Sequence, residues 1–165
     1  MPADAFHETL SVLLGELTDG ASPSAGYVLN PADPGLLASL DRLSSAEASG
    51  SVAGGATIAA HVAHVTFGIS LMNQWAAGAS PFDSADWLAA WQTTAVDDAG
   101  WARLRQNLRD ELERWKPVVR TPRQLDTEER LGMAASVVHL AYHLGAIRQI
   151  AAGARGPKDG SVPTG

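Results

Sequence analysis

The stretch Ala134-Ala-Ser-Val-Val-His-Leu-Ala-Tyr-His-Leu-Gly-Ala-Ile-Arg-Gln149 gives the clearest indication of how this chain folds and what it binds. Its pattern predicts an α-helix, and it places His139 and His143 four residues apart. Positions i and i+4 of a helix lie on the same face, about 6 Å apart along the axis. Two imidazoles placed in this way can bind one metal ion.

A second pair of histidines, His61 and His64, lies far upstream on another predicted helix. Four of the five histidines therefore fall in two short clusters. The remaining one, His7, has no ligand-type residue near it, so we expect a hydrogen-bonded core residue there. Two clusters on two helices favour a metal site over two unrelated core pairs.

Small residues lie beside these histidines along the predicted helix faces. Gly132, Ala135 and Ala146 share the face of the downstream pair, and Gly68 follows His64 by one turn. They leave room for an ion and for a molecule bound to it. Neutral imidazoles bind Zn²⁺, Ni²⁺ or Fe²⁺, and the ligands alone do not identify the metal. An ion with an open position acidifies a bound water or thiol.

The composition narrows the possible chemistry. The chain has 165 residues and a formal net charge of −6. No run of Lys or Arg is present, which disfavours nucleic acid as a partner. The absence of cysteine excludes disulfides, cysteine-bound zinc and cysteine nucleophiles, so His, Asp and Glu are the available metal ligands. We expect one domain, residues 1–153, followed by a mobile C-terminal tail, residues 154–165.

A membrane partner is also disfavoured. Residues 48–82 contain no Asp, Glu, Lys or Arg, but polar residues interrupt them, among them two histidines, Asn73 and Gln74. A helix buried on several sides of a bundle explains this pattern better than a membrane span. The N-terminus lacks the charged and apolar regions of a signal peptide. We therefore expect a cytoplasmic protein.

Apolar residues at three- and four-residue spacing predict four long helices, at about 3–17, 57–77, 98–115 and 126–152. Thr57 is the expected N-cap of the second, and Lys116-Pro117 the expected end of the third. Asp126 and Glu129 have capping-box spacing, and Arg148 is expected to carry its charge in solvent. Short helices are expected at about 34–43 and around Trp87 and Trp91. This pattern predicts an all-α four-helix bundle with short accessory helices in its connections.

Other catalytic or binding motifs are less convincing. Ser136 lies one turn before His139, but no carboxylate completes a catalytic triad. Gly54-Gly55 is not followed by the Gly-Lys-Ser/Thr of a phosphate-binding loop. The tryptophans are expected to anchor the core and the bundle edges, with a pocket mouth as the alternative position for Trp75 and Trp91.

Two passages resemble motifs of the DinB-like family, also called the DinB/YfiT-like metalloenzymes. The first is Thr57-Ile-Ala-Ala-His-Val-Ala-His-Val-Thr-Phe-Gly68, which is similar to the motif on the family's second helix. The second, Val138-His-Leu-Ala-Tyr-His-Leu-Gly-Ala-Ile-Arg-Gln149, is similar to the signature His-x-x-x-His-x-Gly-Gln-Ile-Arg-Gln. It departs from the signature at Ala146, where Gln is common. The resemblance covers residues from about 3 to 153.

The resemblance implies an up-down-down-up bundle with a divalent metal held by His64, His139 and His143, and thus selects His64 over His61. His61 and Tyr142 are then expected beside the ligands or at the pocket. Homodimers are common among such proteins. Some relatives transfer or isomerise groups with a low-molecular-weight thiol cosubstrate such as bacillithiol or mycothiol.

Two functions remain open from the sequence. The first is a metal-dependent enzyme, a thiol (S-)transferase or a metal-assisted hydrolase, acting on a small molecule. The alternative is a non-catalytic module that binds a small molecule or dimerises, with a vestigial or structural histidine cluster. The ligands are visible in the sequence, but the pocket for a substrate is not.

Overall fold

The computed structural model describes residues 3–157 and is all-helical, with no strand within this range. The all-α class predicted from the sequence is therefore confirmed. The α-helices are α1 (Ala3–Asp19), α2 (Gly35–Asp41), α3 (Ser45–Ser49), α4 (Ile58–Ala76), α5 (Asp98–Arg120) and α6 (Thr127–Ile150). Short 3-10 helices are η1 (Pro81–Ser84), η2 (Ala89–Trp91) and η3 (Ala152–Ala154).

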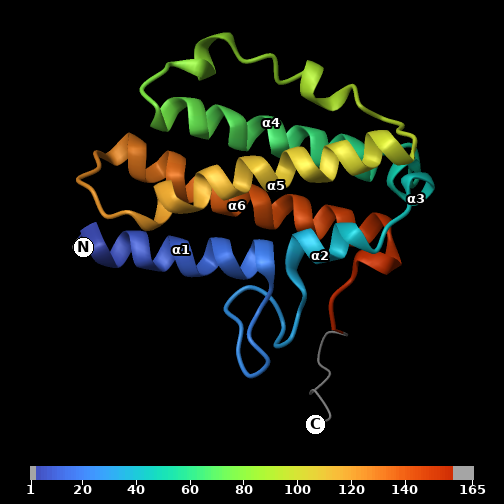
Figure 1. Ribbon diagram of the computed structural model, residues 1–165, viewed down its shortest axis with the longest axis horizontal. Helices are drawn as coiled ribbons and strands as arrows, with labels where there is room; N and C mark the ends of the chain where they lie inside the picture. Colours follow the sequence, from blue (N-terminus) through green and yellow to red (C-terminus); the bar gives the residue numbers. More distant parts are fainter. Residues whose placement is uncertain (1–2, 158–165) are drawn as a thin grey trace.

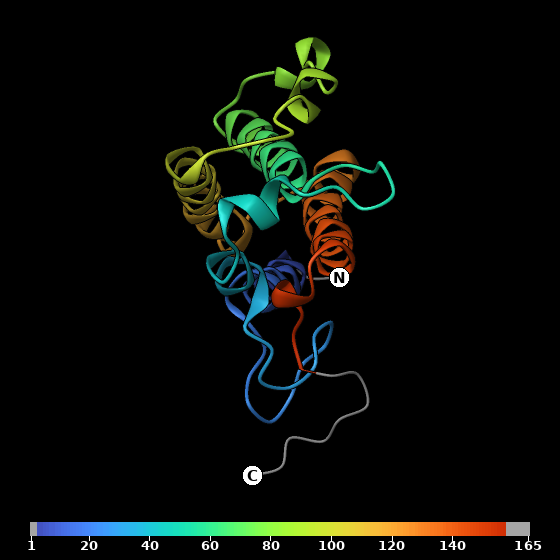
Figure 2. The same cartoon turned by 90° about the vertical axis from the view of Figure 1, so that its right-hand side faces the viewer.

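The four long helices form a ring. Helix α1 packs against α5 and α6, and α4 packs against the same two helices from the opposite side. Figure 2 shows the four long helices roughly end-on, so that their arrangement in a ring can be seen. Figure 1 shows that the connection between α4 and α5 runs back along the length of the molecule, and η1 and η2 lie in it. Both 3-10 helices contact α4, so the connection covers its outer side.

The core lies inside the ring and is built mainly from aliphatic side chains, with two buried tryptophans, Trp101 and Trp115. Fully buried side chains come from every long helix and from α2: Leu14, Leu17, Leu36, Leu40, Ile58, Ile69, Leu108, Leu112, Trp115 and Leu140. Each such burial contributes about 1.5–3 kcal/mol relative to exposure. The indole nitrogen of Trp115 donates to Ser136 Oγ at 3.1 Å. The hydroxyl of Ser136 therefore accepts a hydrogen bond inside the core, as expected of a serine that belongs to no catalytic triad.

The predicted helix starts agree with the structure. Thr57 caps α4 by accepting from the backbone N–H of Ala60, and Asp126 and Glu129 form the reciprocal capping box of α6. A further capping box, Ser44 with Glu47, begins α3, a helix that the sequence analysis did not predict.

The predicted end of the third long helix is wrong, because α5 continues through Pro117 to Arg120. Proline removes one backbone donor and normally ends a helix. Here the last turn is fixed by packing, since Val119 is completely buried. The carbonyl of Val119 also accepts a hydrogen bond from His7 Nδ1 at 2.7 Å. Tertiary contacts therefore outweigh the loss of one donor.

The segment between α1 and α2 is fixed by two acidic side chains. Glu16 accepts hydrogen bonds from the backbone N–H groups of residues 27–29, at 2.6–3.0 Å. Asp33 forms a bidentate pair with Arg148, at 2.6 and 2.9 Å, and is only 2 % exposed. The expectation that Arg148 carries its charge in solvent is therefore wrong, because its guanidinium is paired inside this loop.

The C-terminal segment is described only in part. Ala154 is buried, and its carbonyl accepts from Arg148 Nε at 3.2 Å. Residues 158–165, most of the predicted mobile tail, lie outside the described residues, so the tail stays a prediction. Within residues 3–157, no helix has the length and apolar character needed to cross a membrane.

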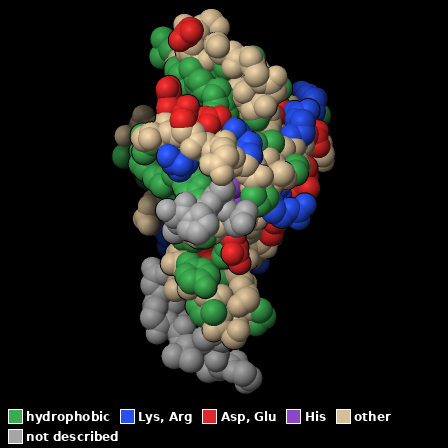
Figure 3. All heavy atoms as spheres, turned by 90° about the vertical axis from the view of Figure 1, so that its left-hand side faces the viewer, with side chains coloured by type: hydrophobic (Ala, Val, Ile, Leu, Met, Phe, Trp, Pro, Cys, Tyr) green, Lys and Arg blue, Asp and Glu red, His purple; other side chains and the backbone are tan. Residues whose placement is uncertain are grey.

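Charges of both signs lie close together at the end of the molecule where α1 begins (Figure 3). Arg123, in the connection between α5 and α6, pairs with Glu129 at 2.7 Å, and Lys116 pairs with Asp19, the last residue of α1, at 2.9 Å. That face carries no continuous basic surface.

Candidate metal centre

Helices α4 and α6 bring the two histidine pairs together. Nε2 of His139 lies 3.2 Å from Nε2 of His64 and 2.9 Å from Nε2 of His143. The ligand atoms of these three residues all lie within 4.8 Å of one another. Nitrogens bound to a tetrahedral ion at about 2.0–2.1 Å lie about 3.3 Å apart. The three imidazoles therefore have the spacing of a metal-binding set.

The electrostatics of the cluster also fit a divalent ion. Burial, together with the neighbouring histidines, lowers the pKa of His64 to about 4 and that of His143 to about 3. Burial also lowers the pKa of His139. The three rings are thus neutral at pH 7, which is the form that binds metals. Three donors leave a coordination position for a water or a substrate atom.

His61 contacts the cluster through a different atom. Its Nδ1 lies 2.8 Å from Nδ1 of His143, on the side of that ring away from the convergent Nε2 atoms. With Nε2 of His143 as the ligand atom, Nδ1 of His143 carries the proton and donates to His61. Such partners fix the orientation of a ligand ring and tune its basicity. His61 therefore lies beside a ligand, as the resemblance implied.

Two tryptophans from the α4–α5 connection cover the centre. The ring of Trp91 stacks on His64, with centroids 4.2 Å apart, and meets His61 edge-on at 5.3 Å. Trp87 lies 5.6 Å from His64. Trp91 thus packs on the histidine cluster, whereas Trp75, the other tryptophan with a pocket mouth as its alternative position, lines a surface cavity. The role of Trp87 was missed, although its four-residue spacing from Trp91 was an available signal.

The other predicted residues occupy different surroundings. Tyr142 is 68 % exposed and places its ring edge-on to His143 at 5.1 Å. His7 is far from the cluster in the fold. Its Nδ1 donates to Val119, and its Nε2 accepts from the backbone N–H of Arg123 at 3.2 Å. The prediction of a hydrogen-bonded core histidine is thus confirmed for His7.

A cavity of about 330 Å³ opens beside His139. Its wall is almost entirely apolar and is formed by Gly68, Ile69, Met72, Phe82, Trp87, Gly132, Ala135, Ser136 and His139. The absence of a side chain at Gly68 keeps the space in front of the imidazole open. A Cβ atom there would lie 3.5 Å from Cε1 of His139.

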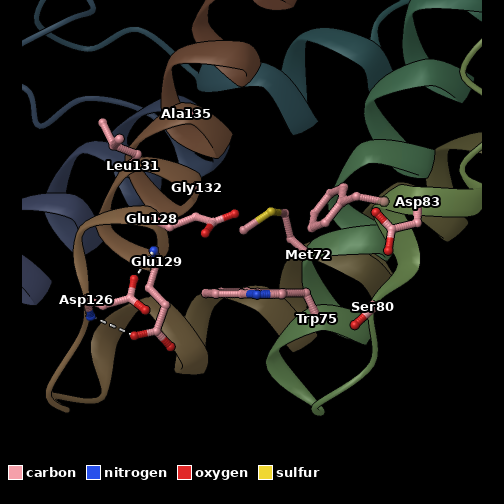
Figure 4. A pocket seen from close by; sticks show the side chains of 11 residues that line it. Met72, Trp75, Ser80, Asp83, Asp126, Glu128, Glu129, Leu131, Gly132 and Ala135 are labelled. Carbon is pink, nitrogen blue, oxygen red and sulfur yellow. Dashed lines mark hydrogen bonds between the residues drawn. The ribbon is translucent and has the colours of Figure 1, made fainter.

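A wider cavity of about 700 Å³ adjoins it and shares the lining residues Met72, Phe82, Gly132 and Ala135. Figure 4 shows this outer part, with Met72 and Trp75 on one wall and α6 on the other. The capping pair of α6, Asp126 and Glu129, lies at its end. The two cavities are therefore neighbours on the same side of the molecule, and His139 lines the smaller one.

Comparisons with protein-family models, with curated proteins and with solved structures give no match for this chain. The interpretation of the site therefore rests on its geometry.

Proposed function

We propose that this protein is a metal-dependent enzyme in which His64, His139 and His143 hold one divalent ion. The observation that carries the proposal is the convergence of their three Nε2 atoms at the end of an apolar cavity. We further propose that the fold is the up-down-down-up bundle of the DinB-like family. The ring of long helices and the long α4–α5 connection support this assignment.

The surrounding residues have separate tasks in this mechanism. A bound ion supplies Lewis acidity that lowers the pKa of a coordinated water or thiol. His61 orients the ring of His143, and Trp91 fixes the ring of His64 by stacking. The apolar wall excludes bulk water, which strengthens electrostatic interactions inside the site. These features suit attack by a hydroxide or thiolate on a small molecule.

The cavity favours a substrate with a small apolar part. Its lining offers almost no hydrogen-bonding groups besides His139, so polar specificity has to come from the metal centre. We propose transfer of a low-molecular-weight thiol to an electrophile held in this cavity, with metal-assisted hydrolysis as the second possibility.

Metal analysis of untagged protein tests the centre directly. Wild type, purified without added metal or chelator, should contain about one equivalent of a transition metal, and His139→Ala should contain none. His7→Gln, which removes a histidine outside the cluster, should retain the metal. If wild type neither contains metal nor binds it at micromolar concentrations, the proposal is wrong.

The alternative is a binding module whose histidine cluster is only structural. The apolar cavity favours it as a second candidate, because an apolar cavity can bind a small molecule without metal chemistry. A structural metal predicts a sharp fall in melting temperature on chelation, whereas an open catalytic centre predicts a nearly intact fold.

A further inference from the structure

Residues 80–95, the middle of the α4–α5 connection, lie over the histidine cluster and make few polar contacts with the rest of the molecule. Their hydrogen bonds join residues of the segment to one another, as between the N–H of Trp91 and the carbonyl of Leu88 at 3.1 Å. Over the part of the chain that the structure describes, no hydrogen bond or ion pair joins this segment to a helix outside it. Figure 2 shows the segment outside the ring, beyond α4.

Both ends of the segment, in contrast, are fixed to helices. At its start, the N–H of Ala79 donates to the carbonyl of Gln74 at 3.1 Å. The chain leaves α4 there through Gly78, whose φ of +92° lies in the left-handed region that favours glycine. At its end, the N–H of Val96 donates to Oγ of Ser49 at 3.0 Å. The segment therefore has two fixed ends and a middle that hydrogen bonds do not hold in place.

Two tryptophans hold the middle of the segment against the cluster. Trp91 stacks on His64, meets His61 edge-on, and lies 5.7 Å from His143 between ring centroids. Trp87 lies tilted against His64 at 5.6 Å. One indole therefore contacts three of the four clustered histidines, and a second indole lies beside it. Each such ring contact is weak, and all of them are lost together if the segment moves outward.

The tryptophans of the core are fixed in a different way. The indole nitrogens of Trp101 and Trp115 donate hydrogen bonds at 2.8 and 3.1 Å, and these side chains are 2 % and 0 % exposed. Trp87 is 40 % exposed, and within residues 3–157 neither its indole nitrogen nor that of Trp91 donates a hydrogen bond. The two indoles over the cluster are therefore attached by ring contacts alone.

The covered arrangement leaves one polar atom of the cluster without a partner. Nδ1 of His64 is buried and forms no hydrogen bond with any described residue. An unpaired polar atom shut away from water destabilises the state that buries it. Movement of the two tryptophans away from His64 would let water reach this nitrogen. The covered and uncovered arrangements are therefore closer in free energy than the ring contacts alone would make them.

We propose that residues 80–95 form a lid that opens and closes over the histidine cluster, with Trp91 as the residue that holds it shut. In the closed arrangement described above, His64 and His143 are only 8 % and 1 % exposed. In the open arrangement, an ion or a small molecule reaches the histidines, and closure then excludes water. The opening itself does not depend on a bound metal, whereas its role in admitting an ion rests on the proposed function.

The five tryptophans of the chain allow the lid to be followed separately from the core. In metal-free protein labelled with 5-fluorotryptophan, each indole gives its own fluorine signal, which single Trp→Phe substitutions assign. Relaxation dispersion should show microsecond-to-millisecond exchange at Trp87 and Trp91, the timescale on which lids move. Trp101 and Trp115 are the internal controls and should show none. Flat profiles at Trp87 and Trp91, or equal exchange at all four residues, would overturn the proposal.

The rate of metal release gives a second measurement, made on the loaded protein. Trp91→Ala should release Zn²⁺ to an excess of chelator about tenfold faster than wild type, because it removes the ring contacts that hold the lid shut. Trp91→Phe keeps an aromatic ring and should restore much of the slow release. Leu88→Ala, at a 75 % exposed position of the same segment, is the matched control and should release Zn²⁺ at the wild-type rate.

The rate of metal uptake separates a lid from a contact that only supports a ligand. If Trp91 holds the lid shut, uptake of Zn²⁺ by metal-free Trp91→Ala should accelerate by a similar factor, since both directions pass through the open arrangement. Faster release with unchanged uptake would show that Trp91 only supports His64, and its role in the lid would be refuted. An unchanged helical circular-dichroism signal controls for folding. A wild type that binds no metal would refute the proposed function, while the fluorine measurement would still decide whether the lid opens.

Discussion

At the scale of single residues, the two histidines of α4 differ in the atom that faces the cluster. His64 presents Nε2 to the convergent nitrogens, whereas His61 contacts only Nδ1 of His143. Under the proposed function, this difference gives His64 the role of a ligand and His61 the role of orienting His143.

We therefore expect different losses of metal from two substitutions on α4. His64→Ala should abolish stoichiometric binding, because it removes a ligand. His61→Phe keeps a ring against Trp91 but removes the hydrogen bond to His143, and should weaken affinity about 10–100-fold. Competition with a chromophoric chelator measures both. Wild-type affinity in His64→Ala, with none left in His61→Phe, would reverse the assignment.

Gly68 allows access to His139 to be changed without changing a ligand. Gly68→Ala fits at ordinary contact distance and should stabilise α4 by up to about 1 kcal/mol. Gly68→Leu should fill the cavity, so that toluene no longer binds in saturation-transfer NMR while the metal content stays at the wild-type level. Toluene binding that persists in Gly68→Leu would place the apolar site elsewhere.

At the scale of elements, the loop between α1 and α2 depends on buried acidic residues more than on apolar contacts. Asp33 forms a buried pair with Arg148, whereas Asp41 forms exposed pairs with Arg105 and Arg109. Pairing between an aspartate and an arginine therefore occurs inside the protein at Asp33 and at its surface at Asp41.

Replacing one acid of each kind should give very different losses of stability. Asp33→Asn leaves a buried guanidinium without its counter-charge and should cost about 3 kcal/mol or more. Asp41→Asn breaks only exposed pairs and should cost less than about 1 kcal/mol. Urea denaturation measures the free energy of unfolding of each variant, and the two losses can be compared if the m-values are equal. Equal losses would mean that the buried pair of Asp33 with Arg148 contributes no more to stability than the exposed pairs of Asp41.

Because of Glu16, we expect the contribution of the α1–α2 loop to stability to depend on pH. Burial acts to raise the pKa of Glu16, but the backbone N–H groups of residues 27–29 outweigh it and hold the pKa below the ordinary 4.5. The stabilisation is therefore present above pH 4.5 and is lost as the pH falls through the lower, folded-state pKa. Glu16→Gln should lower the free energy of unfolding by about 2 kcal/mol at pH 7. The difference from wild type should shrink in acid, and a difference independent of pH would contradict this role.

The sequence allowed the local features of these elements to be predicted, but not their long-range contacts. The starts of α4 and α6 follow from Thr57 and Asp126, since capping depends on neighbours three residues away. The extension of α5 through Pro117 depends on His7, more than a hundred residues earlier, and could not be inferred from local pattern. The pairing of Arg148 with Asp33 was missed for the same reason.

In the candidate site, too, local features could be predicted from the sequence and long-range contacts could not. The four-residue spacing of His139 and His143 is a helical property, and the sequence alone was sufficient to identify the pair. The choice between His61 and His64 depends on how α4 is rotated against α6, which periodicity does not fix. The wall formed by Trp87 and Trp91 depends on the course of an irregular connection.

At the scale of the whole molecule, the core and the metal centre are largely separate. The most buried apolar side chains come from all four long helices, while the centre joins only α4 and α6. Removal of the metal with a chelator should therefore leave the helical circular-dichroism signal unchanged and lower the melting temperature by only a few degrees. Loss of helical structure at room temperature would show that the metal is structural.

The ring order has a consequence for the timing of folding during synthesis. The two ring neighbours of α1 are α5 and α6, the last long helices to be translated, and the hydrogen-bond acceptor of His7 lies 112 residues downstream. At about 5–20 residues per second, the ribosome needs roughly 6–22 s to reach Val119 after His7. The apolar face of α1 remains without its final partners during that interval. Helix α1 is thus translated before both of its ring neighbours and completes its packing only after they have emerged.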